Sequence, residues 1–279
     1  MRNSRSVVRT ASIAITACLV CLTLAGAANG SAQTAHQPKP TPKPTVVLLH
    51  GAWADGSSWA AVTAKLQGDG FTVDVVPNPL RGVASDAQYL RDYLATIAGP
   101  IVLVGHSYAG MVITNAATGN ANVRALVYVD AFIPQQGDTV QELAGAQPGS
   151  GLDPNTTINA VPIRDAAGNV VDVDLYVKPT LFPALFAAGS PAKIAAVLAA
   201  SQRPETLSSL SEAFTGVPAW ETIPSWALIG TDDRVIPPAE QQIMAARAHA
   251  HIVKVAAPPL SMVSDPDAVA ALITTASQR

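Results

Sequence analysis

Ser107 stands where residue type and neighbours favour nucleophilic chemistry. Residues 105–110 read GHSYAG and follow the apolar run at residues 101–104 (IVLV). A serine between a buried strand and a helix lies on a tight, strained turn, which needs small neighbours; Ala109 stands where the G-x-S-x-G pattern has its second glycine. The helix that follows points its N-terminus at the serine, where its dipole can stabilise an oxyanion. Ser107 is therefore the predicted nucleophile, although a plain strand–turn–helix with an exposed serine shares this pattern.

A second loop offers a hydrogen-bond donor for the same oxyanion. Residues 50–53 (HGAW) follow the apolar run at residues 46–49. A loop at this place lies beside a serine elbow and supplies one amide of an oxyanion hole. The predicted pair is the backbone N–H of Ala52 and that of Tyr108. A β-turn with a structural histidine would have the same geometry.

An acidic pair follows the late apolar strand that ends at Ile229. Residues 230–237 read GTDDRVIP. An acid at this strand end is suited to hold a histidine in one tautomer and to stabilise its charged form. The G-x-x-D-x-x-x-P register favours Asp233 over Asp232. Either aspartate could instead cap the helix expected to begin near residue 237 or 238.

The elements that must position these residues alternate between apolar strands and helices. Strands are expected at residues 46–49, 71–76, 101–104, 123–129, 226–229 and 252–255, and helices at residues 59–66, 84–98, 111–117, 239–248 and 267–276. This alternation predicts an α/β fold with a mostly parallel sheet and helices on both faces. Residues 134–224 interrupt it with a hairpin pattern (161–164 and 170–177) and two Ala-rich helical pieces. We expect this insertion to form a cap over the active site.

The N-terminal segment has the pattern of an export signal. Residues 1–32 combine three early arginines with an apolar stretch over residues 11–28 and small residues suited to signal peptidase. We therefore expect a secreted or extracytoplasmic protein without stable membrane insertion after cleavage. The alternative is an uncleaved N-terminal anchor.

The rest of the chain divides into a linker and one domain. Residues 33–44 form a Pro-rich linker, and residues 45–279 form the predicted domain. Both cysteines, Cys18 and Cys21, precede the linker, so the mature chain would hold no thiol for a disulfide, a nucleophile or a metal site. The chain is 49% hydrophobic and 13% charged, which suits a large core, and a net charge of −3 without a basic run gives no support for nucleic-acid binding.

Three of these segments together resemble the α/β-hydrolase superfamily: residues 105–110, residues 50–53 and residues 233–238 (DRVIPP). The likeness covers essentially all of residues 45–279. A narrower likeness to a bacterial branch of small capped hydrolases, similar in pattern to plant methylesterases and hydroxynitrile lyases, rests on residues 201–204 (SQRP), 224–226 (PSW) and 261–266 (SMVSDP). The resemblance implies ester hydrolysis by a serine triad with Ser107 and Asp233, and no metal or organic cofactor.

The histidine that the resemblance implies is missing from its place. In similar proteins the loop after the last strand reads roughly S-H-x-S-M-V-S-x-P, whereas residues 258–266 read PPLSMVSDP. Pro259 occupies the histidine position, and the triad is degenerate. His50 or His106 could supply a substitute base. His249 and His251 precede the last strand, whose length of roughly 15 Å should place them at the other edge of the sheet.

Two functions therefore remain open. Without its base a serine is a weak nucleophile at neutral pH. The first hypothesis is an exported serine esterase that acts on a small, largely apolar ester through Ser107. The second is a catalytically silent protein of the same fold that binds a small apolar ligand, because one fold can host both.

Overall fold

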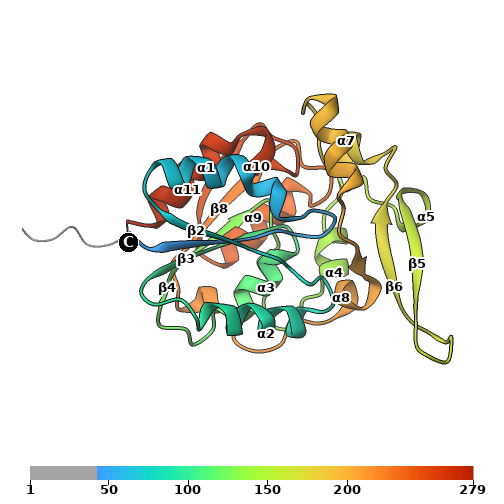
Figure 1. The fold of residues 1–279 in the computed structure, drawn as a ribbon, viewed down its shortest axis with the longest axis horizontal. Coiled ribbons are helices and arrows are strands. Elements are labelled where there is room, and N and C mark those ends of the chain that lie inside the picture. Colours follow the sequence, from blue (N-terminus) through green and yellow to red (C-terminus); the bar gives the residue numbers. More distant parts are fainter. Residues whose placement is uncertain (1–42, 279) are drawn as a thin grey trace, which may run out of the picture. The chain divides into compact units, whose positions relative to one another are not determined.

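A six-stranded parallel sheet forms the centre of the domain. The computed structural model describes residues 43–278, so the predicted export segment and most of the predicted linker lie outside the described residues. The strand order is β2-β1-β3-β4-β8-β9, and each neighbouring pair is parallel (Figure 1). The strands are β1 (Thr45–Leu49), β2 (Thr72–Val76), β3 (Ile101–His106), β4 (Val123–Val129), β8 (Ser225–Gly230) and β9 (His251–Val255). The predicted fold class, an α/β fold with a mostly parallel sheet, is confirmed.

Helices cover both faces of this sheet. On one face α1 packs against α11, and on the other α2 packs against α3 (Figure 1). The helices are α1 (Ala60–Gly68), preceded by the 3₁₀ turn η1 (Gly56–Trp59), α2 (Val83–Leu94), α3 (Ala109–Ala116), α9 (Pro238–Arg247), α10 (Ser261–Ser264) and α11 (Pro266–Ala276). Every residue of β3 and β8 is buried, without a polar alternation. Continuous apolar runs are what a strand covered on both faces requires.

The second helix is shorter than its pattern predicts. The apolar spacing predicts a helix over residues 84–98, but α2 ends at Leu94. Irregular backbone bonds follow, with Ile97 N–H donating to Leu94 O at 3.1 Å. Gly99 then adopts a φ of 93° before the chain enters β3. Such a φ favours glycine, so a local turn interrupts the helical spacing of the apolar residues.

A second group of elements lies between β4 and β8. It comprises α4 (Val140–Gly145), α5 (Pro154–Thr157), β5 (Ile158–Arg164), β6 (Val170–Val177), α6 (Phe182–Leu185), α7 (Ala192–Ala200), β7 (Glu205–Thr206), α8 (Leu207–Ser211) and the 3₁₀ turn η2 (Ala219–Glu221). The strands form an antiparallel sheet of order β5-β6-β7, whose β5–β6 hairpin projects from the domain (Figure 1). These elements occupy the stretch predicted to form the cap.

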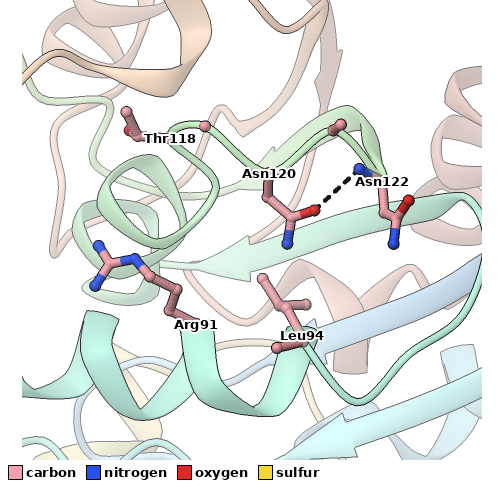
Figure 2. Close-up of a pocket in the computed structure, with 8 residues that line it drawn as sticks. Arg91, Leu94, Thr118, Asn120 and Asn122 are labelled. Atoms are coloured by element: carbon pink, nitrogen blue, oxygen red, sulfur yellow. Dashed lines mark hydrogen bonds between the residues drawn. The ribbon is translucent and has the colours of Figure 1, made fainter.

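One surface hollow of about 360 Å³ lies at the end of the sheet where β3 and β4 begin. Its lining includes Arg91 and Leu94 of α2 and the loop of Asn120 and Asn122, where Asn122 N–H donates to Asn120 Oδ1 at 2.9 Å (Figure 2). Ser107 follows the opposite end of β3. The hollow is therefore remote from the predicted nucleophile.

No helix within residues 43–278 is long and apolar enough to cross a membrane.

Candidate active site

The predicted nucleophile lies on a strained turn that joins β3 to α3. Ser107 has a φ of 53°, in the left-handed region that non-glycine residues rarely occupy. Its N–H donates to Val129 O at 3.3 Å, and its carbonyl accepts from Gly110 N–H at 2.9 Å and from Phe132 N–H at 3.3 Å. Backbone bonds to the end of β4 and beyond it thus hold the turn in this conformation. Strain of this kind persists only where the surrounding structure enforces it.

Two glycines allow the backbone to approach this turn closely. A Cβ added to Gly110 would lie 1.9 Å from Phe132 O. A Cβ added to Gly51 would lie 2.6 Å from His106 O and 2.7 Å from Ser107 Cβ. The HGAW loop therefore lies directly against the nucleophile, as the sequence predicts.

The two amides predicted for the oxyanion hole are both available. The N–H groups of Ala52 and Tyr108 have no acceptor among the residues that the structure describes. The neighbouring amide of Trp53, whose φ is 56°, donates instead to Arg203 O at 3.0 Å. Because backbone N–H groups in folded proteins are nearly always paired, two free amides beside a serine are suited to receive a developing oxyanion.

The loop after β9 brings residue 259 to the elbow. His106 Nε2–H donates to Pro259 O at 2.9 Å, across a sequence separation of 153 residues. Pro258 and Pro259 are both buried. The structure therefore places residue 259 next to the residue that precedes the nucleophile. The proline side chain at this place has no atom that can accept a proton from Ser107.

Two histidines, His50 and His106, lie near the elbow, and both are buried. His50 uses both ring nitrogens, because Nδ1–H donates to Gly51 O and Nε2 accepts from Asn78 N–H, each at 3.0 Å. Burial lowers the pKa of His50 to about 4. Burial also lowers the pKa of His106 to about 4, and its Nδ1 has no partner in the described chain. Within residues 43–278 neither ring is hydrogen-bonded to Ser107 Oγ, so neither shows the geometry of a base.

The two aspartates after β8 differ in burial. Asp232 is exposed, whereas Asp233 is 4% exposed. Asp233 Oδ1 accepts from the N–H groups of Val235 and Ile236 at 2.7 and 3.0 Å, and Oδ2 accepts from Gln241 Nε2 at 2.7 Å. Burial, and then the charge of a second aspartate, Asp130, raises the pKa of Asp233 well above its usual range. The acid favoured by the sequence register is thus the buried one.

That second acid was missed in the sequence. Asp130 directly follows β4, has a φ of 46° and is 1% exposed. Its Oδ1 accepts from Gly230 N–H at 2.8 Å and its Oδ2 from Ser261 N–H at 3.1 Å. Burial raises the pKa of Asp130 to about 7. The available signal was an acid directly after a largely apolar strand, comparable to Asp233, which lies three residues after the end of β8.

The elements between β4 and β8 contact both loops of the predicted site. On the HGAW side, Trp53 Nε1–H donates to Leu175 O at 2.8 Å. The Trp53 ring also meets that of Phe186 edge-on at 5.5 Å between centroids. On the Asp233 side, Gly151 N–H donates to Arg234 O at 2.7 Å. The insertion is therefore attached both to the HGAW loop and to the loop that contains Asp233.

Comparisons with known proteins bear on the fold and the family of this chain. The Carbendazim hydrolyzing esterase of Nocardioides sp. (strain SG-4G) is 38% identical over 112 residues, which are 35% of this chain and 46% of that protein. The match thus spans about half the length of that relative. The crystal structure of polyneuridine aldehyde esterase has a TM-score of 0.72 at 17% identity, over 84% of this chain and 98% of the other. An extracellular alpha/beta-hydrolase from a Paenibacillus species has a TM-score of 0.68 at 20% identity, over 85% and 100%.

The two structural likenesses show the fold, and the sequence shows the family. Residues 46–272 match the Alpha/beta hydrolase family, which confirms the resemblance drawn from the motifs. This chain belongs to the Alpha/beta hydrolase family.

Proposed function

We propose that this protein is an exported carboxylic-ester hydrolase of low intrinsic activity, with Ser107 as its nucleophile. The observation that carries the proposal is the strained serine at φ 53° beside the free amides of Ala52 and Tyr108. The similarity to an esterase of 38% identity over 112 residues supports the same class of reaction. Its substrate is a small, largely apolar ester.

The chemistry of this arrangement proceeds in two steps. Ser107 Oγ attacks the ester carbonyl carbon while its proton passes to water, and the carbonyl oxygen becomes an oxyanion that the amides of Ala52 and Tyr108 stabilise. Collapse of this intermediate expels the alcohol, which recovers a proton from water, and leaves an acyl-serine. Water then attacks the acyl group and releases the acid and free Ser107.

The missing histidine sets the expected rate. In a serine protease the triad contributes roughly 10⁶-fold, and the oxyanion hole with substrate binding alone retains about 10³–10⁴-fold over water. Pro259 cannot take the proton of Ser107, and Asp233 then has no imidazole to orient. The expected activity of the unchanged chain is therefore near this residual level.

A second candidate function is a catalytically silent protein that binds a small apolar ligand at the same place. Pro259 at the predicted base position favours it, together with the lack of any described hydrogen bond from His50 or His106 to Ser107. The elbow and the oxyanion amides would then remain as parts of the fold.

Ester hydrolysis by the full chain separates the two functions. The assay compares the unchanged protein with Ser107→Ala and Pro259→His on p-nitrophenyl acetate, p-nitrophenyl butyrate and carbendazim, the compound named for the relative. Pro258→His is the matched control, because it puts a histidine one residue away in the same buried loop. Turnover by the unchanged protein above that of Ser107→Ala supports the esterase. If only Pro259→His exceeds Ser107→Ala, the unchanged chain is silent for lack of a base. If no variant exceeds Ser107→Ala on any substrate, the roles assigned to Ser107 and Pro259 are wrong.

A further inference from the structure

Asp130 joins three segments of the chain at the carboxyl end of the sheet. It follows β4, and its two oxygens accept from Gly230 at the end of β8 and from Ser261 at the start of α10. A Cβ added to Gly230 would lie 2.6 Å from Ala257 O, 3.0 Å from Asp130 Oδ1 and 3.2 Å from Ser261 Oγ. The segment of residues 257–261, which includes position 259, is therefore held against β8 by close packing and by one carboxyl group.

Asp130 and Asp233 form a pair of buried acids without a described counter-charge. Asp233 accepts from N–H donors, and Asp130 accepts from two backbone N–H groups and from the side chain of Ser261. The charge of Asp130 is close enough to raise the pKa of Asp233. The ring of His106 directs Nε2–H to Pro259 O. Within residues 43–278 the ion pairs that form are Lys65–Asp267, Arg81–Asp174 and Arg247–Asp138. Two buried carboxylates in this situation strongly favour a cation beside them, or else a proton on one of them.

We propose that Asp130 is a positioning residue of this site, which together with Asp233 forms a seat for a protonated imidazole at position 259. The seat follows from the bond of Asp130 to Ser261 N–H, two residues beyond Pro259, and from the nearness of the two carboxyl groups. Asp233 would orient the imidazole, while Asp130 fixes the loop and adds a second negative charge. The proposal rests on the proposed function only in taking position 259 as the place of the base.

The pKa of an imidazole introduced by Pro259→His tests this seat without requiring turnover. In the full chain, NMR titration of the ring should give a pKa above the unperturbed value of about 6.5. Adding Asp130→Asn should lower that pKa by about one unit, a tenfold loss in proton affinity, since a nearby opposite charge shifts a pKa by roughly 1–3 units. Adding Asp233→Asn should lower it similarly. Asp232→Asn is the matched control, because Asp232 is exposed, and should leave the pKa unchanged.

An imidazole pKa that falls with Asp233→Asn but not with Asp130→Asn would overturn the proposal. Ester hydrolysis, measured on the same samples, reports separately on the proposed function. A pKa that responds to Asp130 without any turnover would support the seat and contradict the esterase. Ester turnover together with an imidazole pKa that Asp130→Asn does not change would support the esterase and contradict the seat.

If Pro259→His does not fold, a second measurement tests whether Asp130 and Asp233 interact. In the unchanged chain, the amide resonances of Val235 and Ile236 should titrate with the carboxyl group of Asp233, whose oxygen accepts from both. The midpoint should fall in Asp130→Asn, because the neighbouring charge is removed. A midpoint identical in both proteins would show that the two acids do not act together, and the proposal would fail.

Discussion

Replacing Asp130 by Asn should change how the stability of the protein depends on pH. The pKa of Asp130 is raised from 3.8 to about 7 in the folded chain, so the folded state binds a proton that the unfolded state releases. The stability that this group contributes is fully present below its unfolded pKa and is lost as the pH rises through the folded value. Asp130→Asn removes the titrating group and therefore this loss.

The magnitude follows from the number of protons involved. One proton held by the folded state alone gives a slope of about 1.4 kcal/mol per pH unit, or roughly 2–3 kcal/mol between about pH 5 and about pH 7. His50 and His106, with pKa values lowered to about 4, have the opposite sign, since their contribution is present above 6.5 and is lost as the pH falls. Both proteins contain these histidines, so their effect cancels in the difference.

Urea unfolding at several pH values from about 5 to about 8 measures the difference. The amide of Asn must turn an N–H₂ group toward Gly230 N–H or Ser261 N–H, which costs about 1–3 kcal/mol at every pH. Apart from this constant cost, the free energy of unfolding of Asp130→Asn should increase relative to that of the unchanged protein as the pH rises. Asp232→Asn should show no such relative increase. A difference between Asp130→Asn and the unchanged protein that stays constant over the whole range would refute the reasoning.

Three further changes test contacts around the site. Gly110→Ala would place a Cβ 1.9 Å from Phe132 O and should cost about 1–3 kcal/mol, seen as a lower Tm in thermal unfolding. Glu212→Gln should cost about 1 kcal/mol in urea unfolding, because the two Glu212 oxygens accept from the first N–H groups of α2 at 2.7 and 3.1 Å. Trp53→Phe removes the Nε1–H bond to Leu175 O, so amide hydrogen exchange in β6 should accelerate while exchange in β3 stays unchanged.

Each of these predictions has an outcome that contradicts it. An unchanged Tm in Gly110→Ala would mean that the elbow helix can shift away from the segment after β4. Equal urea midpoints for Glu212→Gln and for the unchanged protein would show that the carboxylate does not stabilise the start of α2. Faster exchange in β3 as well as β6 would mean that Trp53→Phe loosens the whole domain.

The order of strands and helices could be read from the sequence, because the signals are local. An apolar run such as residues 101–104 forms a strand buried on both faces, and the small residues around Ser107 permit its sharp turn. The missing histidine is likewise visible as Pro259 within a recognisable loop. The end of α2 was misjudged, because the turn at Gly99 decides it rather than the apolar spacing.

The partners of these residues were decided only by the tertiary structure. The preference for Asp233 over Asp232 was a matter of register, and burial is what separates the two acids. No sequence motif marks Asp130, because its hydrogen-bond partner Ser261 lies 131 residues away along the chain. The sequence by itself determined the serine elbow and predicts the loss of the histidine at Pro259, because each depends on residues adjacent in the chain. The two acids that remain beside position 259 required the folded chain, since their nearness and their burial arise from packing between distant segments.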